Sequence, residues 1–103
     1  MEETLSLSPR QRAYLKSLAH PLKPILQIGK EGASDAVVDT IDGAFRTREL
    51  LKVKVLEAAP ESAREIAASL SERVPRVELV QVIGRTMVFY RRHPTNREIT
   101  LPA

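Results

Sequence analysis

The sequence of 103 residues contains no cysteine and no tryptophan, and it has only two tyrosines and two phenylalanines. Without cysteine the chain has no disulfide, no thiolate metal ligand and no thiol nucleophile. No apolar run approaches the length of a membrane span, and the start Met1-Glu2-Glu3 is acidic where a signal peptide would be basic. We therefore expect a soluble protein of the reducing cytoplasm.

The motifs of nucleotide-dependent enzymes are also missing. The sequence has no Gly-x-Gly-x-x-Gly and no Gly-x-x-x-x-Gly-Lys-Ser/Thr. The two histidines, His20 and His93, have no evident nucleophile as a partner, and without cysteine they make a poor set of metal ligands. The sequence therefore predicts no catalytic residues, no metal site, no cofactor and no small-molecule substrate.

The charge is distributed unevenly along the chain. The net charge is +3, but residues 57–75 hold more acidic than basic side chains, whereas residues 1–23 and 76–103 are basic. Such a pattern favours one positive face, which is typical of proteins that bind nucleic acid. Charge alone is equally consistent with a solvated surface that has no ligand.

The stretch from Pro24 to Asp35 is the most informative part of the chain. The apolar β-forming residues of 25–28 end at Gly29, and Lys30, Glu31 and Gly32 follow before Ser34 begins a helix. Two glycines three apart let the backbone approach a partner closely, and RNA-binding KH modules clamp nucleotides with such a loop. Ordinary turn chemistry is the more frequent role of this pattern.

A helix precedes this stretch and carries a line of basic residues. Ser8, Pro9 and Gln11 form a helix-start signature, and the helix is predicted to run to about Ala19, after a loose lead-in over residues 1–7. Leu15, Leu18 and Tyr14 are the predicted buried stripe. Arg12, Lys16 and His20 are four residues apart and therefore lie on one side of the helix, and Lys23 follows them. This line of side chains is predicted to face a phosphate backbone. His20 is equally consistent with a residue that caps the end of the helix.

The remaining elements follow from periodicity and turn signals. We expect helices over about 35–47 and 60–73, the latter with Pro60 in its first turn, and a strand over 50–56 with Lys52 and Lys54 on its wet face. Residues 76–83 and 86–91 form a hairpin with a type II′ turn at Gly84. A short terminal strand is predicted at 98–101.

The element order α-β-α-β-α-β-β predicts an α/β fold with a four-stranded mixed sheet in a two-layer sandwich. Right-handed crossovers make the first three strands mutually parallel and the last one antiparallel, with the helices packed on the apolar face. No linker or repeat interrupts the chain, so we expect one domain over 1–103, with its core at about 7–102. Nothing in the sequence requires more than a monomer.

Four motifs in this order resemble those of one family. They are Leu18–Pro24, the loop Gly29–Gly32, Leu50–Val55 and Gln81–Arg91. Together, over about residues 7–102, they resemble the CRM domain (chloroplast RNA splicing and ribosome maturation), in its stand-alone bacterial YhbY-like form. One departure is that Ala33-Ser34-Asp35 follows the second loop glycine, where the family usually has Leu-Thr or similar; Ser34 still caps the helix.

The resemblance implies a fold like the C-terminal domain of translation initiation factor three, and binding to ribosomal RNA in precursors of the large subunit. It assigns the RNA surface to Gly29, Lys30, Glu31 and Gly32, and to Lys16, His20 and Lys23; Arg12 and Arg85 are added from their charge. Because the aromatic residues are few, we expect readout of shape and phosphate rather than base stacking. The alternative is a module that docks on ribosomal or assembly proteins without touching RNA.

Overall fold

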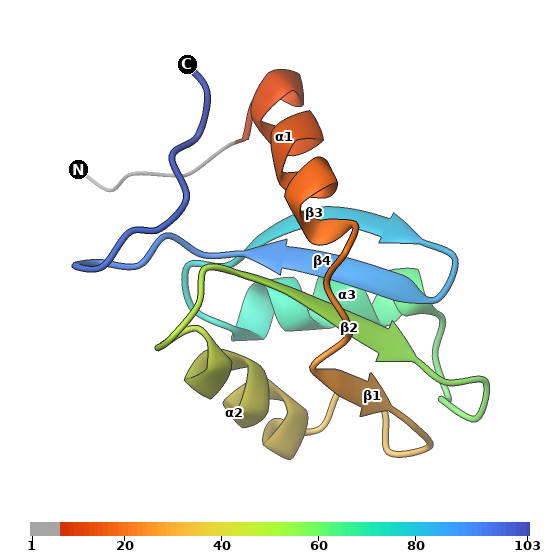
Figure 1. Ribbon diagram of the computed structural model, residues 1–103. Helices are drawn as coiled ribbons and strands as arrows, with labels where there is room; N and C mark the ends of the chain where they lie inside the picture. Colours follow the sequence, from red (N-terminus) through yellow and green to blue (C-terminus); the bar gives the residue numbers. More distant parts are fainter. Residues whose placement is uncertain (1–6) are drawn as a thin grey trace.

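The helices and strands follow one another along the chain in the predicted order (Figure 1). The computed structural model describes residues 7–103. The elements are α1 (Pro9–Ala19), β1 (Leu26–Ile28), α2 (Asp35–Ala44), β2 (Leu50–Val55), α3 (Ala63–Arg73), β3 (Glu78–Ile83) and β4 (Thr86–Tyr90). No helix within these residues is both long enough and apolar enough to span a bilayer.

Each helix begins at a serine that caps it. Ser8 caps α1 in the predicted capping box with Gln11, and Ser34 caps α2. The start of α3 differs from the prediction, because Ser62 caps it in a second capping box with Glu65 and Pro60 lies in the preceding turn. A serine with a glutamate three residues on satisfies two backbone N–H groups, which a proline at the first position does not.

The four strands form a mixed sheet in the order β1-β2-β4-β3. β1 pairs with β2 in parallel, and β4 lies antiparallel between β2 and β3. The first three strands therefore point the same way and the last one opposes them, as predicted. The register of the β3–β4 pair shifts between Leu79 and Gln81, which makes a bulge in the edge strand.

The larger core lies between the sheet and the helices α2 and α3, which cover one face (Figure 1). Leu51, Val53 and Val55 of β2 point into it, as their alternation predicted, and meet Ile41 and Phe45 from the end of α2. The helix α2 ends at Ala44, three residues before its predicted end. The mixed four-stranded α/β sheet is thus confirmed.

The packing of α1 corrects the prediction that the helices share one face in two layers. This helix lies on the opposite side of the sheet, where Leu15 and Ala19 pack against Leu50, Val88 and Tyr90 (Figure 1). Tyr14, predicted in the buried stripe, is 39% exposed. The sheet is therefore covered on one face by α2 and α3 and on part of the other by α1.

Besides Gly32, two residues in turns adopt the left-handed conformation that most side chains avoid. Gly84 has φ +60° at the first central position of the β3–β4 turn, in accord with the predicted type II′ geometry. Arg76 has φ +58° in the connection from α3 to β3, and it is the non-glycine residue that takes this conformation within residues 7–103.

The C-terminal segment after β4 is not a strand, so the prediction of a strand at 98–101 is wrong. Its backbone amides bind a side chain instead. Glu49 is 3% exposed, and its carboxylate accepts hydrogen bonds from the amides of His93 (2.7 Å), Glu98 (2.8 Å) and Ile99 (2.8 Å). The predicted lead-in lies outside the described residues except for Leu7, which is buried with α1.

Candidate nucleic-acid interface

The glycine loop joins the end of β1 to the start of α2. The Gly32 amide donates to the Gly29 carbonyl at 3.0 Å, which closes a four-residue turn around Lys30 and Glu31. Both central side chains are exposed, and neither central amide is needed for the bond that closes the turn. The loop therefore presents one cationic and one anionic side chain to solvent, and its closing bond leaves the two central amides unused.

The two glycines of the loop are required for different reasons. Gly32 has φ +63°, and a Cβ atom there would lie 3.3 Å from the Pro60 ring, so the fold itself requires glycine at this position. The backbone at Gly29 is not left-handed, and a Cβ atom there would meet only Leu56, at an ordinary contact distance of 3.8 Å. The fold therefore tolerates a side chain at position 29.

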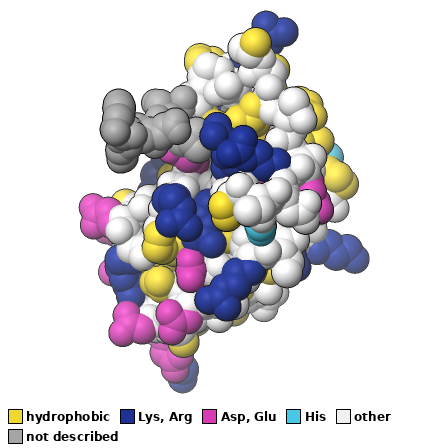
Figure 2. Space-filling view, turned by 90° about the vertical axis from the view of Figure 1, so that its left-hand side faces the viewer, with side chains coloured by type: hydrophobic (Ala, Val, Ile, Leu, Met, Phe, Trp, Pro, Cys, Tyr) yellow, Lys and Arg dark blue, Asp and Glu magenta, His cyan; other side chains and the backbone are white. Residues whose placement is uncertain are grey.

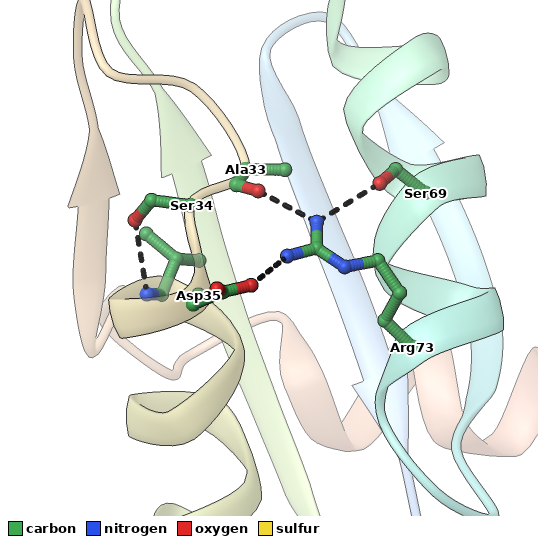
Figure 3. A network of polar contacts seen from close by, with 6 residues as sticks. Ala33, Ser34, Asp35, Ser69 and Arg73 are labelled. Atoms are coloured by element: carbon green, nitrogen blue, oxygen red, sulfur yellow. Dashed lines mark hydrogen bonds and ion pairs between the residues drawn. The ribbon is translucent and has the colours of Figure 1, made fainter.

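Arg73 of α3 holds the segment that follows the loop (Figure 3). Its guanidinium donates to the Ala33 carbonyl at 2.6 Å, to the Ser69 hydroxyl at 3.2 Å and to the Asp35 carboxylate at 2.8 Å. Ser34, between the two loop-side partners, caps α2 by accepting the Val37 amide at 3.2 Å. These bonds fix the loop relative to both helices before any ligand arrives. Sequence reasoning missed Arg73, since its partners lie 38 and 40 residues away in the chain.

A cleft of about 360 Å³ lies between α1 and the uncovered part of the sheet. Three lysines and one histidine line it, together with apolar side chains and the polar groups of Gln81 and Thr86; they are Lys16, Lys52, Lys54 and His20. No aspartate or glutamate of residues 7–103 lines it. Such a cleft attracts an anionic chain and supplies several cations to it.

The structure brings together some of the predicted site residues in this cleft. Lys16 and His20 are exposed on the side of α1 that faces it, and Lys52 Nζ donates to the His20 carbonyl at 3.3 Å. Lys23 is exposed in the connection to β1. Lys52 and Lys54 were predicted on the wet face of their strand, but α1 had not been predicted above that face, so the cleft was missed.

The Arg12 side chain is hydrogen-bonded within the protein. Its guanidinium donates to the backbone carbonyls of Leu79 (2.5 Å) and Val80 (2.9 Å), at the bulge of β3. Burial raises the pKa of Glu78 and the charge of Arg12 opposes that rise, so the carboxyl group lies near it. The predicted basic line on α1 therefore separates into a structural Arg12 and the two exposed residues over the cleft.

The glycine loop and the cleft are neighbours on the sheet. Gln27 of β1 pairs with Lys54 of β2, and Gly29 follows two residues after Gln27, at a rise of roughly 3.3 Å per residue. Arg85, in the β3–β4 turn, lies at the same end of the sheet, where its carbonyl accepts the Val55 amide at 2.7 Å (Figure 1). Its guanidinium is 3.7 Å from the Glu57 carboxylate on the surface.

The aromatic residues are not arranged to stack on bases. Phe45, Phe89 and Tyr90 are at most 2% exposed, and only Tyr14 reaches the surface, on α1. Within residues 7–103, no group of three or more histidine, aspartate or glutamate side chains is placed to hold a metal ion. The surface therefore offers cations, amides and a cleft, which suit contacts to phosphate and sugar.

Comparison with known proteins is consistent with this arrangement. The CRS1 / YhbY (CRM) domain matches residues 7–91 of the chain. The probable RNA-binding protein YqeI of Bacillus subtilis is 41% identical over 96 residues, which cover 93% of this chain and 99% of that protein. An RNA-binding protein of Haemophilus influenzae is 36% identical over 86 residues, covering 84% of this chain and 86% of its own.

A solved structure has the same fold. The solution structure of SAV1595 from Staphylococcus aureus, described as a candidate RNA-binding protein, superposes with a TM-score of 0.78 at 46% sequence identity. The match covers 94% of this chain and 100% of that one.

Proposed function

Since the chain belongs to the CRS1/YhbY (CRM) domain family, we propose that it binds RNA as a single domain through the glycine loop and the lysine cleft beside it. The specific target we propose is ribosomal RNA in precursors of the large subunit, where the protein acts in the cytoplasm as an assembly factor. Its role is binding rather than catalysis, and it acts as a monomer.

The lysine cleft is the observation that carries this proposal. Lys16, Lys52 and Lys54 line one cleft together with His20, and no carboxylate is among its lining residues. Like charges gathered in this way repel one another, and a phosphate backbone supplies the counter-charge. The relatives named as RNA-binding proteins support the same conclusion.

In the mechanism that we propose, Lys30 and the free amides of the loop hold one phosphate while the lysines of the cleft follow the backbone. Gly29 lets the RNA approach the loop closely, and Gly32 keeps the turn in shape. Because the phenylalanines and Tyr90 are buried and only Tyr14 is exposed, affinity comes from phosphate and shape, with little dependence on sequence. The affinity should then fall steeply with salt. With the value for duplex DNA applied to duplex RNA, a plot of log K against the logarithm of the salt concentration has a slope of about −0.9 for each phosphate contact.

The proposal is tested by sedimentation of lysates from bacteria that express the tagged protein, on sucrose gradients at low and high salt. We expect co-migration with large-subunit precursors that is lost at high salt and in Lys30→Glu. Arg64→Glu is the matched control, because Arg64 is an exposed residue of α3 outside the cleft and the loop. If Lys30→Glu migrates with the precursors as the wild type does, the loop does not hold RNA. If co-migration of the wild type also survives high salt, docking on a protein is the better explanation.

A further inference from the structure

A second group of basic side chains lies at the other end of the sheet, away from the glycine loop. We call it the arginine end, and its members come from the α2–β2 connection, the α3–β3 connection and the C-terminal segment: Arg46, Arg48, Arg76, Arg92 and Arg97. Figure 2 views the molecule from this side and shows Lys and Arg side chains gathered over the middle of the face, with most acidic ones toward its lower margin. None of these residues was predicted to belong to the site.

The fold fixes the segments that carry these arginines against one another. Glu49 binds the amides of His93, Glu98 and Ile99, which ties the C-terminal segment to the start of β2. The His93 ring completes the junction, since its Nε2 lies 3.0 Å from the Arg46 carbonyl and its Nδ1 accepts the Asn96 amide at 2.9 Å. The arginine end is therefore a built surface rather than a set of loose chain ends.

Two carboxylates near the arginine end are bound within the protein, whereas the Glu98 side chain in the C-terminal segment is exposed. Glu49 is buried among backbone amides, and Asp42 pairs with the buried Arg91 at 2.7 Å. The hydrogen bond from Arg91 lowers the pKa of Asp42, and the charges of Arg46 and Arg76 lower it further, which places both guanidinium groups near that carboxylate. The ion pairs found among residues 7–103 involve none of the five arginines. Four of them are exposed, Arg92 is half-buried, and Arg97 Nε also donates to the His93 carbonyl at 3.3 Å.

We propose that the arginine end is a second phosphate-binding surface, which lets one copy of the protein hold two RNA segments at the same time. This inference rests on the proposed function. Guanidinium groups bind phosphate oxygens with two parallel N–H bonds, and they suit a rigid surface, where little freedom is lost on binding. The strand β2 separates the two surfaces, and its six residues span roughly 17 Å at about 3.3 Å per residue.

The test uses native mass spectrometry of the protein with an excess of an eight-base-pair RNA hairpin. We expect complexes with two hairpins on one wild-type monomer. Arg46→Gln/Arg48→Gln should bind the first hairpin normally and the second at least about tenfold more weakly, as two lost phosphate contacts require. Both side chains are exposed and form no ion pair with residues 7–103, so the variant should fold. Arg64→Gln, a neutralisation on α3, should keep both binding steps.

The outcomes separate this inference from the proposed function. One hairpin per monomer at every excess overturns the second surface and leaves RNA binding intact. Two hairpins on the double variant with unchanged affinity overturn the assignment to Arg46 and Arg48. Absence of any complex, at low salt, overturns the RNA-binding function itself.

Discussion

Replacing each loop glycine with alanine separates the part of the loop that the fold requires from the part that RNA requires. Gly32→Ala puts a Cβ atom on a backbone with φ +63°, at 3.3 Å from the rigid Pro60 ring and 3.4 Å from the flexible Glu61 carboxylate. The left-handed conformation costs an alanine about 1–2 kcal/mol relative to glycine. We expect the free energy of unfolding to fall by about that amount, and the melting temperature to fall by roughly 5 °C or more.

Gly29→Ala is the matched variant, since its Cβ atom meets only Leu56 at 3.8 Å and the backbone there is not left-handed. Its stability should equal that of the wild type or rise by about 0.5 kcal/mol, because alanine restricts the unfolded chain. Urea unfolding followed by circular dichroism measures both variants. If Gly32→Ala unfolds at the wild-type midpoint, the turn does not have the conformation described here.

Stability should be more sensitive to Gly32→Ala, whereas RNA affinity should be sensitive to Gly29→Ala. If the backbone at Gly29 lies against RNA, a methyl group there weakens binding of a fluorescent RNA hairpin by about tenfold, or 1.4 kcal/mol, while the fold is unaffected. Fluorescence anisotropy at fixed salt measures this change. Full affinity in Gly29→Ala would refute the close approach at this glycine.

Three further predictions concern the stability of the other end of the sheet, each measured by urea unfolding. Glu49→Gln should lose about 2 kcal/mol, because a buried amide group then faces the His93 amide, and wild-type stability would show that the carboxylate is not needed. Asp42→Asn should lose about 1 kcal/mol at pH 7. Arg91 lowers the pKa of Asp42 below its ordinary 3.8. The stability difference between wild type and Asp42→Asn is therefore fully present above pH 3.8, and it should vanish as the pH falls through the lower pKa of the folded state. A stability difference that stays constant down to about pH 2 contradicts this prediction. Arg76→Gly should gain about 0.5 kcal/mol by relieving φ +58°, and a loss of stability would refute the view that this backbone is strained.

The local signals of the sequence predicted most of the fold. The alternation of Leu51, Val53 and Val55 identified the buried face of β2, and the capping box at Ser8 identified the start of α1. These features depend on residues a few positions apart, where periodicity and capping chemistry act. The same capping signature at Ser62 was overlooked because Pro60 offered a competing start for α3.

Features that depend on distant residues could not be predicted in this way. Glu49 resembles an ordinary surface glutamate in the sequence, because the amides that it binds lie 44 to 50 residues away. Arg12 has the spacing of a phosphate-facing residue, but its carbonyl partners are 67 and 68 residues away. The lysine cleft exists only because α1 packs on the second face of the sheet, which no local pattern specifies.

The bonds of Arg12 to Leu79 and Val80 also affect how copies of the protein behave when they are crowded together. β3 is an edge of the sheet, and unpaired carbonyls on an edge can template a strand from another chain. Arg12 occupies two of these acceptors at the bulge, and the opposite edge, β1, is only three residues long. Both edges are thus poor partners for pairing with a strand of another copy, which opposes the growth of an intermolecular sheet.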